Sequence, residues 1–246
     1  MPKLSQPATV ESASGDFHFR GTWKSAALAT AVLAVLAAAA VPTIDGPLAV
    51  AAMHTELPHF VFTMIIHSEV FGDGCGVLFF FAAVWLLDPA RRRCLPRLIA
   101  CAYGSGLAVN VVKLFVARAR PFYWLEQQGG KGLPSFGEWF PMGGNGTAWQ
   151  SFPSGHTATA VGLALGLAAL YPRGRVLFLS LAVLVGCQRV VNDMHYVADV
   201  LAAAIVAIWT TTALFRSRTI TERFERFEAK GRTATAVEET PRRLAA

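Results

Sequence analysis

Ionisable and hydrogen-bonding side chains gather at four places in the chain, each beside a long apolar run. They are Lys113, Arg118 and Arg120 in VVKLFVARARP, Ser154, Gly155 and His156 in SFPSGHTATA, Arg189, Asn192 and Asp193 in GCQRVVNDMH, and His195 and Asp199 in HYVADV. An ionisable side chain inside a membrane costs about 2.5–3.5 kcal/mol on insertion scales, so each one is a candidate functional group. Cations together with imidazoles and a carboxylate suit chemistry on an anion.

The last cluster has the spacing of a nucleophile and its partner. His195 and Asp199 are four residues apart, and on a helix they are neighbours on one face. A carboxylate there can accept the Nδ1 proton of the imidazole and leave Nε2 with a free lone pair. His156 has no acid three or four residues away on either side, so it is better suited to carrying a proton. The alternative for His195 and Asp199 is a polar tether between helices.

The other clusters suit an anion. Lys113 and Arg120 are seven residues apart, which on one helix places them within roughly 20° of the same face. The alternative is snorkelling at a helix end, which we favour for Arg118. Gly155 lets a ligand approach the backbone where a helix begins, and the free N–H groups there bind anions. Ser154 either donates a hydroxyl to that anion or caps the helix.

Composition indicates how these clusters are held. The 246 residues are 54% hydrophobic and 15% charged, with four cysteines and a mean hydropathy of +0.43. Soluble domains carry about 25% charged residues, so the chain is predicted to be a polytopic membrane protein rather than a disordered or disulfide-rich one. We predict an all-α bundle of six transmembrane helices, with an interfacial segment at 48–68 and a long extracytoplasmic loop at 122–152. The six runs are 25–44, 71–88, 97–117, 154–171, 175–191 and 195–215.

Orientation follows from the positive charges. Lys and Arg are frequent in 1–24, 89–97, 172–175 and 216–246, whereas the loop 45–70 has none. The positive-inside rule therefore places both termini in the cytoplasm, with a cytoplasmic N-terminus at 1–24, a six-span domain at 25–215 and a cytoplasmic polar tail at 216–246. All four clusters then meet at the opposite face. Because topology explains the net charge of +6, no nucleic-acid partner is predicted.

Three further features have competing interpretations. The run 25–44 could be a signal peptide, but its apolar part is too long, so cleavage is not expected. The aromatic and Gly-rich loop 122–152 is either a lid over the site or a connector that follows the membrane surface. The outer acids and imidazoles suggest a metal site, although an interfacial role fits them better; these residues are His54, His59, His67, Glu69 and Asp73.

The clusters in order resemble a known signature. Lys113-x6-Arg120-Pro121, Pro153-Ser154-Gly155-His156 and Arg189-x5-His195-x3-Asp199 resemble the three-part motif of the type 2 phosphatidic acid phosphatase superfamily. Its members include membrane lipid phosphatases and soluble vanadium haloperoxidases. The resemblance covers roughly 113–199. Two positions depart from the family pattern: Gln188 stands where a serine is usual, and Phe122 where a further basic residue is common.

The resemblance implies a metal-free mechanism without a cofactor. His195 would attack phosphorus to form a phosphohistidine, Asp199 would orient it, and His156 would protonate the departing oxygen. The residues implied to bind the phosphoryl oxygens are Lys113, Arg120, Ser154, Gly155 and Arg189.

The implied function is dephosphorylation of an amphiphilic lipid phosphate, such as a lipid A 1-phosphate, an isoprenyl diphosphate or a glycerophospholipid phosphate. The site would lie on the periplasmic side of a bacterial inner membrane, with the bilayer and a lipid substrate as partners and no obligate protein partner. The alternatives are a lipid phosphotransferase with the same intermediate and an anion transporter.

Overall fold

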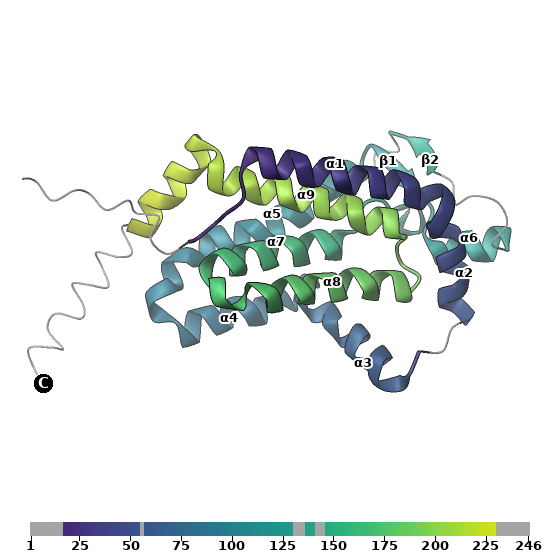
Figure 1. Cartoon of the computed structure of the whole chain (residues 1–246), viewed down its shortest axis with the longest axis horizontal. Helices are drawn as coiled ribbons and strands as arrows, with labels where there is room; N and C mark the ends of the chain where they lie inside the picture. The colour runs from purple at the N-terminus through teal and green to yellow at the C-terminus, as the bar shows by residue number, and fades with distance from the viewer. Residues whose placement is uncertain (1–16, 55–56, 130–135, 141–145, 230–246) are drawn as a thin grey trace, which may run out of the picture.

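A computed structural model describes residues 17–54, 57–129, 136–140 and 146–229, and these are mostly helical (Figure 1). Short π or 3-10 turns (η) join several of the helices. The elements are α1 (Trp23–Ala40), η1 (Val41–Asp45), α2 (Gly46–His54), α3 (His59–His67), η2 (Ser68–Phe71), α4 (Val77–Leu87), η3 (Pro89–Cys94), α5 (Leu95–Lys113), β1 (Val116–Arg118), α6 (Pro121–Gln128), β2 (Phe136–Trp139), η4 (Thr147–Trp149), α7 (Gly155–Leu170), η5 (Pro172–Gly174), α8 (Arg175–Val191), α9 (Val197–Arg216) and a last helix over 218–229.

Helix α7 is the centre of the bundle and packs against α5, α8 and α9. Most of its residues are buried, and many of them are small. A Cβ at Gly162 would overlap the carbonyl oxygen of Cys101, and one at Gly166 would lie 2.7 Å from Leu98 Cδ1. Small residues let apolar helices approach closely, so this stripe brings α5 against α7.

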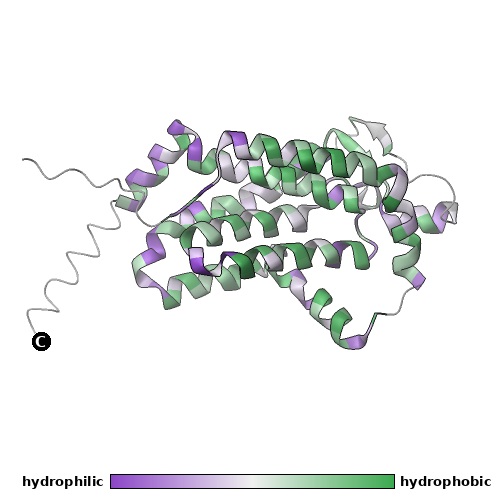
Figure 2. Ribbon diagram, viewed as in Figure 1, coloured by the Kyte–Doolittle hydropathy of each residue, from purple (hydrophilic) through white to green (hydrophobic). Residues whose placement is uncertain are grey.

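Four helical segments are long and apolar enough to cross a membrane: Trp23–His54, Pro89–Lys113, Pro172–Val191 and Val197–Arg216. They account for four of the six predicted spans. Helices α4, with 11 residues, and α7, with 16, coincide with the other two runs but are shorter, so a total of six crossings stays a prediction. Apolar residues follow the middle of the bundle, whereas hydrophilic ones concentrate towards its ends (Figure 2).

The first predicted boundary is wrong. The prolines and glycine at 42–47 were expected to end the first helix, but α1 continues through the π-helical turn η1 into α2. A wide turn of this kind is how helices accommodate proline. The turn also points Asp45 inward, where it is 1% exposed.

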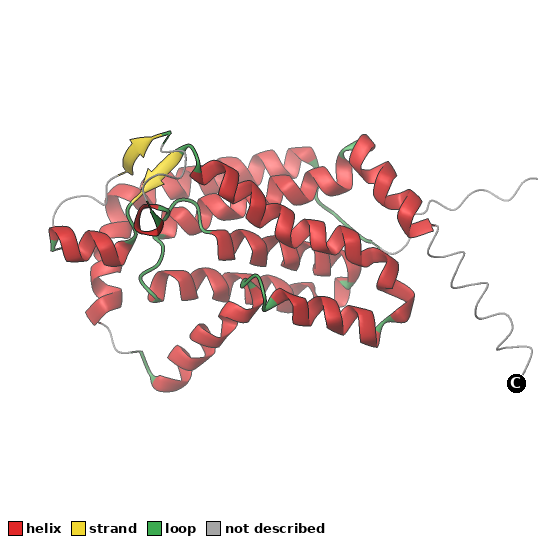
Figure 3. Cartoon of the chain, turned by 180° about the vertical axis from the view of Figure 1, so that it is seen from behind, coloured by secondary structure: helices red, strands yellow, loops and turns green. Residues whose placement is uncertain are grey.

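The chain between the third and fourth predicted spans is not purely helical. Helix α5 ends at Lys113, and β1 pairs with β2 in a two-stranded antiparallel sheet (Figure 3). The prediction that Lys113 and Arg120 share a helix face is therefore wrong. The all-α expectation is correct for the bundle and misses this small sheet.

The two ends of the bundle differ. The sheet, α6 and α2 lie at one end, and the helix over 218–229 lies at the other (Figure 1). At that second end the buried Arg97–Glu228 ion pair, at 2.9 Å, ties the last helix to α5, and the His18 N–H donates to Ala169. Both described ends of the chain are therefore remote from the sheet. The predicted boundaries at 24 and 216 lie close to the start of α1 and the end of α9, while 1–16 and 230–246 lie outside the described residues.

Candidate active site

A cavity of about 420 Å³ lies at the sheet end of the bundle. Helix α5 ends beside it and α7 begins there, while the loop from α8 to α9 closes another side. Six of the eight predicted site residues line it, namely Lys113, Arg120, Gly155, His156, Arg189 and His195. Tertiary packing thus brings three separate sequence motifs to one place.

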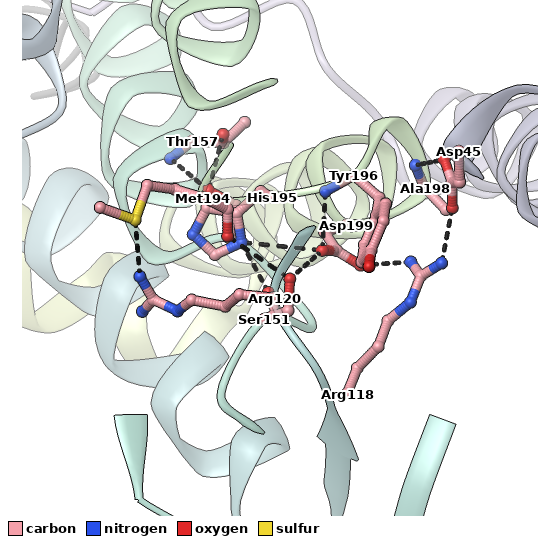
Figure 4. Close-up of polar contacts among 11 residues, drawn as sticks. Asp45, Arg118, Arg120, Ser151, Thr157, Met194, His195, Tyr196, Ala198 and Asp199 are labelled. Carbon is pink, nitrogen blue, oxygen red and sulfur yellow. Dashed lines mark hydrogen bonds and ion pairs between the residues drawn. The ribbon is translucent and has the colours of Figure 1, made fainter. Parts of the chain in front are cut away.

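The His195 ring is held as a neutral base. It is 2% exposed, and its Nδ1 lies 2.7 Å from the carbonyl oxygen of Ser151 (Figure 4). A carbonyl can only accept, so Nδ1 carries the proton and Nε2 keeps its lone pair. Burial lowers the pKa of His195 to about 4, so the ring is uncharged at neutral pH. This is the tautomer that a nucleophilic imidazole needs.

Asp199 supports this arrangement indirectly. Its Oδ2 lies 3.7 Å from His195 Nδ1, beyond hydrogen-bond length, so the predicted direct bond is replaced by the bond to the Ser151 carbonyl. Asp199 Oδ2 accepts from the Ser151 hydroxyl at 2.5 Å and from the Tyr196 N–H at 3.0 Å. One carboxylate therefore fixes the segment that orients His195 and also caps the first turn of α9.

Arg118 is the largest departure from the sequence analysis. The prediction that it snorkels to the surface is wrong, because the side chain is fully buried between two carboxylates (Figure 4). Nη1 lies 2.6 Å from Asp199, and Nη2 lies 2.7 Å from Asp45. The Tyr196 ring lies 4.1 Å from the guanidinium carbon. Because α5 stops at Lys113, the chain turns inward as β1 and carries Arg118 with it.

Sequence reasoning missed Asp45 and Ser151 altogether. Asp45 accepts from the Ala198 N–H at 3.1 Å as well as from Arg118, so it joins η1 to α9. An acid far inside a long apolar helical segment was the available signal for Asp45. No local spacing marked Ser151, whose carbonyl oxygen accepts from His195 and whose hydroxyl donates to Asp199.

The three cations of the cavity have few partners among the described residues. Among the described residues, Lys113 has no hydrogen bond or ion pair, and Arg120 Nη1 contacts only the Met194 sulfur, at 3.1 Å. The Nε atoms of Arg120 and Arg189 are buried without a partner. Burial lowers the pKa of Arg120, but a guanidinium stays charged in proteins. Buried, unpaired donors around a cavity favour an anionic ligand.

Ser154 and Gly155, at the start of α7, have different surroundings. Ser154 is buried and does not line the cavity; its hydroxyl oxygen accepts from the Thr157 N–H at 3.4 Å and from the Thr157 hydroxyl at 3.0 Å. Ser154 is thus the helix cap that was weighed as an alternative, and its contact with phosphate stays a prediction. Gly155 lines the cavity, and a Cβ there would meet nothing within 4 Å. An anion therefore has open access to the helix N-terminus.

His156 faces acids that come from far away in the sequence. Its Nε2 lies 3.5 Å from Glu69 and 3.8 Å from Asp73. Glu69 also accepts from the Arg189 guanidinium and, at 3.2 Å, from the Gln188 amide. The fold therefore places two acids next to His156, although none lies near it in sequence.

Two histidines and three cations around one cavity, on the predicted motif positions, match what the resemblance implies. The model of the PAP2 superfamily matches residues 95–222 of the chain. The chain belongs to the PAP2 superfamily. The matched range contains all eight predicted site residues, whereas Asp45 and Glu69 lie before it.

Three curated proteins are similar to part of the chain. Lipid A 1-phosphatases from Rhizobium johnstonii and Rhizobium etli are each 37% identical over 105 residues, which make up 43% of this chain and 40% and 42% of those proteins. A lipid A 1-phosphatase from Porphyromonas gingivalis is 37% identical over 99 residues, or 36% of this chain and 22% of that protein. The alignments thus span about two fifths or less of these relatives. No solved structure matches the chain.

Proposed function

We propose that the protein removes phosphate from an amphiphilic lipid phosphate, without a metal ion, through a phosphohistidine intermediate. The observation that carries this proposal is the buried neutral imidazole of His195, whose Nδ1 is bonded to Ser151 and whose ring lines a cavity with three cations. A neutral imidazole can attack, and the cations can stabilise the charge that develops on the phosphoryl oxygens.

The first step forms the intermediate. The Nε2 lone pair of His195 bonds to phosphorus, and the bond from phosphorus to the leaving oxygen breaks. The electron pair of that bond goes to the oxygen, which takes a proton from His156. Lys113, Arg120 and Arg189, with the Gly155 N–H, stabilise the equatorial oxygens.

The second step hydrolyses the phosphohistidine and regenerates free His195. Water attacks phosphorus, His156 accepts its proton, and the electron pair of the P–N bond returns to Nε2 of His195. This step needs water at the cavity, and the position of the cavity where α5 ends and α7 begins supports that access.

Lipid A 1-phosphate is the first substrate that we propose, since the curated relatives are named lipid A 1-phosphatases. Isoprenyl diphosphates and glycerophospholipid phosphates share the same chemistry. The proposed location is a bacterial inner membrane with the site on the periplasmic side. It is supported by the positive charge of the 89–97 and 172–175 segments, away from the sheet end.

The test is phosphate release by the purified protein from a panel of these lipids in mixed micelles. His195→Ala should abolish turnover, while His156→Ala should slow it by about 10²–10⁴-fold. The exposed His59→Ala is the matched control and should leave the rate unchanged. Activity that survives in His195→Ala, or that disappears with a chelator, would contradict the proposal. Phosphate release without an added acceptor separates hydrolysis from phosphotransfer, and anion flux into liposomes without turnover would favour a transporter.

A further inference from the structure

A carboxylate outside the three-part motif lies against two residues that line the cavity, His156 and Arg189. Glu69 belongs to η2, more than forty residues before the first motif residue in sequence. Its Oε1 accepts from Arg189 Nη1 and lies 3.5 Å from His156 Nε2, while its Oε2 accepts from Gln188 Nε2 at 3.2 Å. Glu69 therefore touches one predicted phosphate ligand and faces the predicted proton carrier.

The segment that carries Glu69 is anchored on the site. Phe71 is 2% exposed and packs into the main core cluster. A Cβ at Gly72 would lie 2.6 Å from the His156 carbonyl oxygen and 2.8 Å from Val185 Cγ1, so only glycine lets the backbone approach this closely. The Glu69 carbonyl accepts from the Gly72 and Asp73 N–H groups, both at 2.8 Å, which closes the turn. The position of Glu69 is thus fixed by the fold.

Gln188 has a defined task in this arrangement. Its amide nitrogen donates to Glu69, and its amide oxygen accepts from Arg189 Nη1 at 3.3 Å. The shorter serine that the family usually has here could not bridge both partners. The departure from the family pattern and the presence of Glu69 therefore belong to one structural unit.

We propose that Glu69 is a positioning residue, which favours the imidazolium form of His156 that protonates the leaving oxygen. This inference rests on the proposed function. The charged groups that face His156 are Glu69 and Asp73 from the turn, Arg189 from α8 and Lys113 from α5. The two carboxylates favour the protonated ring and the two cations oppose it, so removing Glu69 leaves the cations in excess.

The consequence depends on the leaving group. An alkoxide needs a proton as the P–O bond breaks, whereas p-nitrophenolate leaves without one. A residue that acts through the acid therefore affects alkyl phosphates selectively. A residue that only keeps Arg189 in place affects both substrates equally, because the same phosphoryl oxygens are bound in each case.

The experiment compares kcat/KM of the full-length protein and Glu69→Gln on dodecyl phosphate and on p-nitrophenyl phosphate. We expect a loss of about 10–100-fold on dodecyl phosphate, part of the range for general acid catalysis, and less than about threefold on p-nitrophenyl phosphate. The alkaline limb of the pH profile for dodecyl phosphate should also move to lower pH. Glu222→Gln is the matched control, because Glu222 is a partly exposed acid paired with Arg218 on the helix over 218–229.

An equal loss on both substrates, or no loss on either, would overturn the role of Glu69. Thermal unfolding of Glu69→Gln near the wild-type temperature shows that the variant is folded, and Glu69→Asp tests whether a shorter acid restores part of the selectivity. The outcome is separable from that of the proposed function. If the wild-type protein hydrolyses neither ester, or if His195→Ala retains activity, the proposed function itself fails.

Discussion

Arg118 is the buried charge whose removal we expect to cost the most stability. Its side chain and those of Asp45 and Asp199 are all 0% exposed, and it bonds to both carboxylates. Arg118→Met keeps an extended side chain but leaves two acids without their cation. Removing one partner of a buried ion pair costs about 3–5 kcal/mol, and two stranded carboxylates place this variant at the upper end. For a chain of this size, that corresponds to a fall in Tm of about 10–20 °C.

The assay is thermal unfolding of the purified protein in detergent, followed by tryptophan fluorescence. Asp45→Asn combined with Arg118→Met removes one stranded charge, while an amide oxygen can still accept from the Ala198 N–H. We expect the double variant to recover a clear part of the lost Tm. Arg218→Met is the control; Arg218 is 94% exposed, and its pair with Glu222 should contribute nothing measurable.

Two results would refute this reasoning. The first is an Arg118→Met variant that melts within about 2 °C of the wild type, because a loss of about 3–5 kcal/mol in unfolding free energy would lower Tm by more than that. The second is a double variant no more stable than the single one, because the loss would then not come from uncompensated charge.

Three further predictions concern single residues. The pKa of His195 is lowered to about 4 by burial, against 6.5 for the free ring, so the unfolded chain binds the proton first. Stability should therefore fall by about 3 kcal/mol as pH drops from about 6.5 to about 4, and chemical denaturation of His195→Asn over this range should lack that part of the slope. Gly155→Ala should leave Tm nearly unchanged, because the added Cβ would have no other atom within 4 Å. The same variant should raise Ki for vanadate at least about tenfold, because its methyl group lies where an anion would reach the helix N-terminus. Gly162→Ala should lower Tm, because its Cβ overlaps the Cys101 carbonyl and separates α5 from α7; an unchanged melting curve would contradict that packing.

The motif residues were predictable because their spacing is local. The pair His195–Asp199 and the triplet Ser154–Gly155–His156 each lie within one turn of a helix start, and the number of apolar runs indicates which of their ends meet. Helix continuation was less predictable. A proline was expected to end the first helix, and the end of α5 at Lys113 was not visible. The local sequence pattern reports neither a π-helical turn nor the pairing of two short strands.

The sequence by itself determined the membrane-type composition, most of the helices and six of the residues that line the cavity. It could do so because hydropathy and short motif spacings are properties of neighbouring residues. Only the tertiary structure decided the polar partners of the site residues. Ser151 rather than Asp199 bonds to His195, and Arg118 lies between Asp45 and Asp199. Glu69 lies next to His156. These partners are separated by tens of residues and are selected because a buried polar group must find its counterpart wherever the fold supplies one.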